Sequence, residues 1–104
     1  MEKNENYYKS GLKLILFQLQ YLDPNSLPDW DDASKNYFTQ AYPGDRIKRI
    51  GDGITWYAGH EEIDISGLIP DINYSTDEIK FFLEYVLEGL IDSGLYQPEL
   101  IMKS

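Results

Sequence analysis

The 104-residue chain contains no cysteine and a single histidine, His60. Without cysteine it can form neither disulfide bonds nor a thiolate metal site, so we expect it to work in a reducing compartment, the cytoplasm. Long apolar runs are also missing, because the longest nearly apolar run, residues 14–17, is far shorter than the ~20 residues that cross a bilayer. The N-terminal residues lack the pattern of a signal peptide. We therefore expect a soluble protein that does not associate with membranes.

Basic residues are scarce. Nine Lys and Arg stand against 18 Asp and Glu, which gives a formal net charge of −9. A field of this sign repels the phosphates of nucleic acids and attracts basic proteins. The charge therefore argues against direct binding of nucleic acid and indicates a basic protein partner, although acidity can also serve solubility alone.

Motifs for catalysis or cofactor binding are absent. Residues 60–64, HEEID, differ from the HExxH motif of zinc proteases because Asp64 replaces the second histidine. Their pattern is that of a strand, on which Glu61 and Glu62 point to opposite sides and do not share a metal ion. Gly51-Asp52-Gly53 matches neither a GxxxxGKS/T nor a GxGxxG phosphate-binding loop. We expect no enzyme activity, no cofactor and no metal site.

Hydrophobic residues are plentiful, at 42%, and aromatic residues reach 14%. This composition favours a packed core over disorder, and the length is that of one domain, residues 1–104. We therefore expect the chain to fold despite its charge, without disulfide bonds or a structural metal ion.

The segment 75–94 carries the clearest helix signal. Ser75 and Glu78 have the spacing of a capping box, and Gly94 stands where a left-handed residue would end the helix. Apolar residues recur every three or four positions, which places them on one face. The other face is either solvated or a partner-binding patch. Its acidic stripe includes Glu84, Glu88 and Asp92.

Two further helices are predicted. Residues 4–22 have apolar side chains at helical spacing, and Asp23-Pro24 ends that run. The loop that follows, 23–32, contains two prolines and leads into a second helix, 29–41, in which Asp29 is the cap and Tyr37 and Phe38 face inward. This helix ends before Pro43, because a residue that precedes proline is disfavoured in helical geometry.

From residue 45 the pattern changes to that of strands. Residues 46–50 and 54–58 are short and rich in β-branched or aromatic residues, and the intervening Gly51-Asp52-Gly53 is typical of a hairpin turn. Residues 61–66 then alternate between polar and apolar. The expected fold class is α+β, with a small antiparallel β-meander of about three strands packed against two to three helices. Residues 99–102 form either a short strand or a frayed turn.

Trp30 lies among three aspartates, Asp29, Asp31 and Asp32. These acids either cap a helix while Trp30 closes the core, or form an acidic rim around an aromatic anchor for a basic partner. The second interpretation gives a predicted contact surface that also includes the acids of the third strand. Its members are Asp29, Trp30, Asp31, Asp32, Glu61, Glu62 and Asp64, with Tyr57 or Trp56 as the central anchor, depending on which faces outward.

In its small size, acidity and lack of a catalytic constellation, the chain resembles the immunity proteins that neutralise bacterial toxins, including those of contact-dependent growth inhibition and colicin-like systems. The resemblance covers the whole chain in size and charge but includes no specific motif, so it assigns no role to any residue. Such proteins often block cationic nuclease domains. The resemblance implies that this chain is an inhibitor. Such an inhibitor would bind a cognate basic toxin domain as a monomer, in a 1:1 complex, and occlude the active site of the toxin.

Other functions stay open. A nucleic-acid mimic that inhibits a nuclease or restriction system would carry carboxylates at phosphate-like spacing, and the sequence shows no such ladder. A small adaptor with another partner would share the same acidic surface. An enzyme would bring His60 together with Glu61 or Asp64 in a pocket with shifted pKa values.

Overall fold

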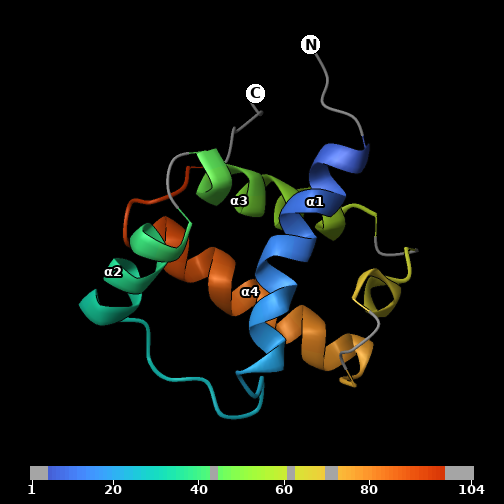
Figure 1. Cartoon of the computed structure of the whole chain (residues 1–104), viewed down its shortest axis with the longest axis horizontal. Coiled ribbons are helices and arrows are strands. Elements are labelled where there is room, and N and C mark those ends of the chain that lie inside the picture. The colour runs from blue at the N-terminus through green and yellow to red at the C-terminus, as the bar shows by residue number, and fades with distance from the viewer. Residues whose placement is uncertain (1–4, 43–44, 61–62, 70–72, 98–104) are drawn as a thin grey trace.

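The computed structural model describes residues 5–42, 45–60, 63–69 and 73–97, and every regular element within these ranges is helical. In chain order the elements are α1 (Glu5–Leu16), the 3-10 segment η1 (Phe17–Gln20), α2 (Asp32–Ala41), α3 (Asp45–Ala58), the 3-10 segment η2 (Ile65–Leu68) and α4 (Thr76–Asp92). Figure 1 shows α1 crossing α3 and α4, with α2 at one side. The predicted α+β fold with a β-meander is therefore wrong, because the described ranges contain no strand.

The predicted hairpin is replaced by α3. Ile47, Ile50, Ile54 and Tyr57 are all buried, and their spacing of three or four residues puts them on one helical face. The predicted third strand is also wrong where it is described, since residues 65–68 form η2. Residues 63 and 64 are described and form no strand, whereas Glu61, Glu62 and the segment 99–102 lie outside the described residues.

The glycines that suggested a turn lie inside α3 and serve close packing. A Cβ on Gly53 would lie 2.6 Å from the carbonyl oxygen of Tyr8 in α1. A Cβ on Gly51 would overlap the ring of Tyr96, and one on Gly11 would overlap the carbonyl oxygen of Arg49. Gly11 and Gly53 therefore let the backbones of α1 and α3 approach each other closely, and Gly51 makes room for the Tyr96 ring.

The ends of α4 agree with the sequence prediction. Ser75 Oγ accepts a hydrogen bond from the Glu78 amide at 3.2 Å, and Glu78 Oε1 accepts one from the Ser75 amide at 2.9 Å. Gly94 has φ of 77° and the Leu95 amide donates to the Leu90 carbonyl at 2.9 Å, as expected for a left-handed helix end. The predicted capping box and the predicted end of this helix are confirmed.

The other two predicted helices differ from the structure mainly at their ends. The run expected at 4–22 forms α1 and then tightens into η1, which ends at Gln20. The cap of α2 is Asp31 rather than Asp29, because Asp31 Oδ1 accepts a hydrogen bond from the Ser34 amide at 3.0 Å. Phe38 is buried as expected, whereas Tyr37 is 51% exposed.

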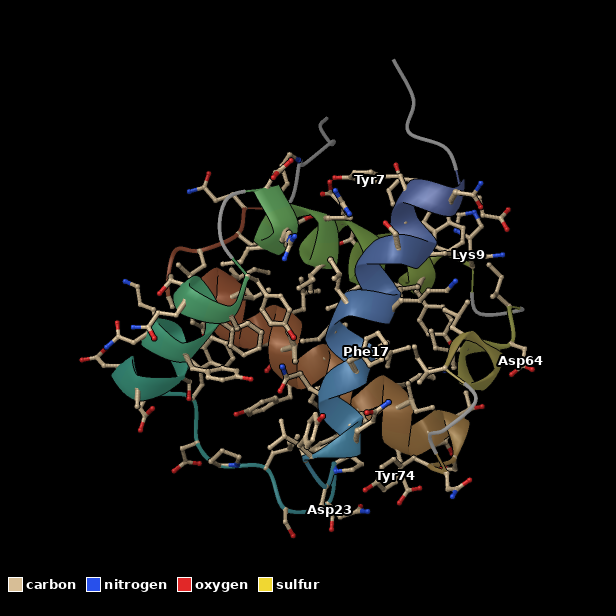
Figure 2. All side chains as sticks on the ribbon, in the orientation of Figure 1. Tyr7, Lys9, Phe17, Asp23, Asp64 and Tyr74 are labelled. Carbon is tan, nitrogen blue, oxygen red and sulfur yellow. The ribbon has the colours of Figure 1, made fainter. Side chains whose placement is uncertain are left out.

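The core lies between α1, α3 and α4, which supply all of the largest fully buried side chains except Ile65 and Pro24 (Figure 2). Large fully buried side chains include Leu12 and Ile15 of α1, Ile50 of α3, and Phe82 and Val86 of α4. By contrast α2 buries only Phe38, so it covers the edge of the core rather than its centre. None of the described helices combines the length and apolar character needed to cross a membrane.

Candidate functional site

The loop between η1 and α2 is fastened to α4 by two hydrogen bonds. Asn25 Nδ2 donates to Glu78 Oε2 at 2.7 Å, and the Tyr85 hydroxyl donates to the Pro28 carbonyl at 2.8 Å. These bonds hold the aspartates of the loop beside the outward face of α4. The two acidic patches that the sequence presents as competitors are therefore neighbours.

Trp30 joins this loop to two helices. Its ring lies flat enough against α4 that a Cβ on Gly89 would overlap three of its atoms. The ring centroid lies 5.0 Å from that of Phe38 in α2 and 5.9 Å, edge-on, from that of Tyr85 in α4. Trp30 is only partly buried. It closes the edge of the core, as the first interpretation drawn from the sequence predicted, and the residue keeps some exposed surface. The second interpretation, an anchor for a basic partner, stays a prediction.

Two cavities flank Trp30. One, of about 570 Å³, lies between the loop and α4 and includes Phe81, Glu88 and Asp92 in its lining. The other, of about 510 Å³, lies between the loop, α2 and α4. Pro28, Asp29, Trp30 and Tyr85 line both cavities, so the two openings share a wall. Both volumes fall within the range of protein ligand sites.

We call the surface around these openings the Trp30 face. It combines exposed carboxylates with aromatic rings from the loop and from α4. Its residues are Asp29, Trp30, Asp31, Phe81, Tyr85, Glu88 and Asp92.

Negative charge acts directly on this face. Backbone and side-chain hydrogen bonds from Ser34 hold the pKa of the Asp31 carboxyl below its ordinary value, so Asp31 is charged at neutral pH. Burial raises the pKa of the Tyr85 hydroxyl, and the nearby charges of Asp31 and Asp29 raise it further. Hydrogen bonds from Asn25 and then from the Ser75 amide lower the pKa of Glu78, which keeps the loop anchor ionised.

Several predicted contact residues lie elsewhere. Tyr57 is 3% exposed and belongs to the core of α3, so it does not present a side chain to a partner. Trp56 is partly buried and stacks between Tyr8 and His60. Asp64 is exposed beside η2, at the opposite edge of the molecule from α2 in Figure 2. Asp32 is exposed in the first turn of α2 but lines neither cavity.

The sequence prediction missed the exposed aromatic residues of this region. Tyr21 is 84% exposed, Phe81 59% and Tyr37 51%. Phe81 falls outside the apolar stripe of the segment 75–94, and that off-stripe position was the available signal. No local pattern marks Tyr37, which follows the spacing of a buried residue.

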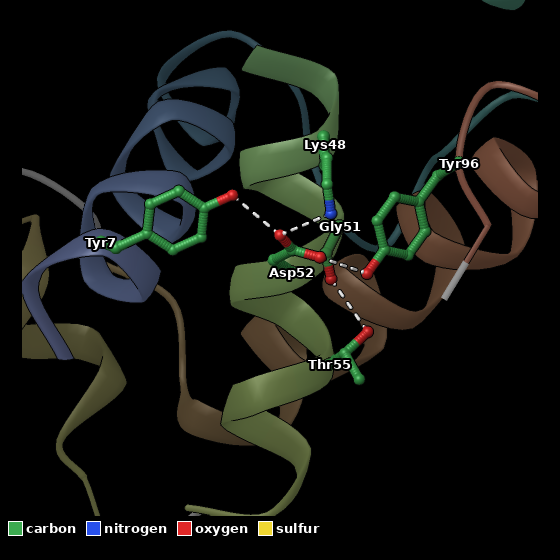
Figure 3. A network of polar contacts seen from close by, with 6 residues as sticks. All are labelled: Tyr7, Lys48, Gly51, Asp52, Thr55 and Tyr96. Carbon is green, nitrogen blue, oxygen red and sulfur yellow. Dashed lines mark hydrogen bonds and ion pairs between the residues drawn. The ribbon is translucent and has the colours of Figure 1, made fainter. Parts of the chain in front are cut away.

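A second polar cluster surrounds Asp52 in the middle of α3 (Figure 3). Its side chain is 12% exposed and accepts hydrogen bonds from the hydroxyls of Tyr7 and Tyr96, each at 2.7 Å, while Lys48 Nζ lies 3.3 Å away. Burial alone would raise the pKa of Asp52, but the bonds from Tyr96, Tyr7 and Lys48 outweigh it and lower that pKa. These residues line neither cavity, and the cluster ties α1 and the segment after α4 to α3.

The single histidine lies just after the end of α3. His60 lies with Nδ1 2.8 Å from the Trp56 carbonyl oxygen and lines neither cavity. Within the described ranges, no three His, Asp or Glu side chains are grouped so as to hold a metal ion. Comparison of the chain with protein-family models, with curated proteins and with solved structures finds no match.

Proposed function

We propose that this protein is a cytoplasmic inhibitor that binds a basic toxin domain, such as a nuclease, and occludes its active site with the Trp30 face. The observation that supports this most directly is the joining of the loop acids and the α4 acids into one surface around partly exposed aromatic rings. Aromatic side chains seated in pockets are the usual source of binding energy in protein interfaces. The carboxylates around them match a cationic partner.

The charge of the chain suits this task kinetically. A nuclease holds the phosphates of its substrate with basic residues, and the net charge of −9 attracts such a surface over a long range. Steering of this kind raises association rates by about 10- to 1,000-fold and weakens as salt is added. Contacts of Trp30, Tyr85 and Phe81 with the partner would then slow dissociation.

The proposal predicts that a basic toxin domain is encoded beside the gene for this chain, and that domain serves for the test. Asp29→Lys with Glu88→Lys reverses two charges on the Trp30 face. Glu5→Lys with Asp64→Lys makes the same change at exposed positions that line neither cavity. We expect the first pair to slow association at least about tenfold at low salt, and the second to change it by less than about threefold.

Toxin activity is measured in the same mixtures. The native chain and the control pair should suppress it at a 1:1 ratio, and the first pair should need an excess. Equal slowing by both pairs would remove the Trp30 face as the contact surface. A toxin domain that stays fully active in the presence of the native chain would refute the inhibitor function itself.

A further inference from the structure

The cavity of about 510 Å³, which we call the tyrosine cavity, changes character from its interior to its mouth. Its innermost lining is apolar, because Phe38, Phe82 and Val86 are all at most 7% exposed. Tyr37 and Tyr21, which also line it, are 51% and 84% exposed and therefore stand at the outer edge. An occupant would meet hydrocarbon inside and aromatic rings nearer to the solvent.

The aromatic walls are held before anything binds. The Tyr37 hydroxyl accepts a hydrogen bond from Gln18 Nε2 at 3.0 Å and lies 3.2 Å from Gln18 Oε1. The Tyr85 hydroxyl is fixed by its bond to the Pro28 carbonyl at 2.8 Å. A site whose walls are already ordered loses less conformational entropy when it is filled.

The charge at the cavity is of one sign. Asp29 and Asp31 line it, and none of the described residues in its lining is basic. Both carboxylates are exposed, and they line the same cavity as the Tyr85 ring. The cavity therefore combines negative charge, aromatic faces and an apolar interior.

We infer that the tyrosine cavity binds an arginine side chain of the partner protein, an inference that rests on the proposed function. Arginine enters from the solvent with its guanidinium foremost, so its methylene stem lies along the rings at the mouth, Tyr37 and Tyr21. Its planar guanidinium can stack on the aromatic walls and donate hydrogen bonds to Asp29 and Asp31. Lysine matches less well because its ammonium group is compact and strongly hydrated, and an apolar side chain would make no use of the carboxylates.

The inference is tested without the toxin, by NMR titration of the full chain with the peptide acetyl-Gly-Arg-Gly-amide. Citrulline in place of arginine gives a control peptide of the same shape without charge, and lysine gives a control of the same charge. The NMR signal of Trp56 serves as an internal control for that of Trp30. Trp30 lines the cavity, whereas Trp56, the only other tryptophan, does not. We expect saturable shifts at Trp30 and Tyr37 but not at Trp56. The arginine peptide should bind about fivefold more tightly than the citrulline peptide and about twofold more tightly than the lysine peptide.

Two matched substitutions locate the bound group. Asp31→Asn removes the charge but keeps the helix cap, since asparagine caps as well as aspartate, and should weaken arginine binding about threefold. Asp64→Asn, at an exposed position away from the cavity, should leave it unchanged. Tyr21→Ala should also weaken binding, and its high exposure makes it harmless to folding.

The inference fails if Trp30 shows no saturable shift up to about 20 mM peptide. It also fails if citrulline or lysine binds as well as arginine, or if Trp56 shifts as much as Trp30. Such results leave the inhibitor function intact, because toxin binding is measured separately with the charge-reversed pairs. Arginine binding at Trp30 by a chain that does not inhibit the toxin would refute the function and not the site.

Discussion

The Trp30 ring packs directly on Gly89 of α4, and this contact reverses the usual effect of replacing a helical glycine with alanine. In most helices Gly→Ala stabilises the protein by about 1 kcal/mol, because alanine has the higher helix propensity. Here a Cβ would lie 2.7 Å from Trp30 Cε2 and nearer still to two other ring atoms, so the indole must move away. We therefore expect Gly89→Ala to destabilise the protein.

The size of the effect follows from the area that Trp30 loses. A tryptophan side chain buries roughly 150–250 Å², which corresponds to about 4–6 kcal/mol if all of it is lost to water. Trp30 is only partly buried and would keep some contact with Phe38, so about half of that value is a reasonable loss. After the gain of ~1 kcal/mol in helix propensity, the net destabilisation is about 1–2 kcal/mol.

Urea unfolding followed by circular dichroism measures this change. With an m-value of about 1–2 kcal/mol/M, the midpoint should fall by roughly 1 M. In a Trp56→Phe background Trp30 is the only tryptophan, and its fluorescence, excited selectively over that of the nine tyrosines, should shift to the red as the ring becomes more exposed. The control is Gly59→Ala, where a Cβ meets only one atom, at 3.7 Å, and where stability should change by no more than about 0.5 kcal/mol. If Gly89→Ala were as stable as the native protein, with unchanged emission, the Trp30 ring could not pack directly on Gly89.

Three further predictions concern the scaffold. Gly53→Ala should destabilise the protein by about 2–3 kcal/mol in urea unfolding, because its Cβ meets the backbone of Tyr8, which cannot rotate aside. Ser75→Ala should cost about 1 kcal/mol in the same assay through loss of the α4 cap. Asp52→Asn should be less stable at neutral pH, where the folded carboxylate accepts its tyrosine bonds. Because the folded pKa of Asp52 is lowered, its stabilisation is present above the unfolded pKa and is lost as pH falls through the folded pKa.

Each of the three predictions for Gly53, Ser75 and Asp52 would be contradicted by a specific result. A Gly53→Ala variant more stable than the native protein would mean that α1 and α3 are not closely packed. Ser75→Thr should retain most of the cap, so an equal loss from Thr and Ala would exclude capping as the cause. For Asp52→Asn, the difference from the native protein should shrink below about pH 4, and a difference independent of pH would exclude the carboxylate charge.

Local signals were sufficient where local contacts decide the structure. The capping box of α4 involves Ser75 and Glu78, three residues apart, and Gly94 ends the same helix, so its sequence alone predicts both ends. The first-turn acids of α2 are similarly local, although the cap is Asp31 and not Asp29. An apolar stripe that recurs every three or four residues then identifies the buried face of α4.

The error in α3 has a physical cause. Its buried residues Ile47, Ile50, Ile54 and Tyr57 do follow helical spacing, but β-branched residues and two glycines gave the stretch a hairpin signature. The glycines are explained by Tyr8 and Tyr96, more than 40 positions away in the chain. A single sequence does not distinguish a glycine that turns the chain from one that makes room for a neighbour.

The candidate site was predicted only in part for the same reason. The acids beside Trp30 were recognised, but the bonds that bring the loop to α4 join residues 53 and 57 positions apart. Without them the stripe that contains Glu88 and Asp92 looked like a rival surface. The prediction also grouped Asp64 with the loop because it assumed a strand, and the helical fold places Asp64 at the opposite edge.

The same use of glycine connects the fold to the proposed site. Gly11, Gly51 and Gly53 make room for chain segments that hold the core together, whereas Gly89 makes room for a ring that remains partly in water. A glycine inside a helix costs about 1 kcal/mol relative to alanine, and the contacts of the Trp30 ring outweigh that cost. The pair therefore stabilises the edge of the core and also keeps a large aromatic residue partly exposed. A large aromatic surface fixed among carboxylates is what a protein needs to hold a basic partner, and this is why the Trp30 face, rather than the acidic charge by itself, carries the proposed function.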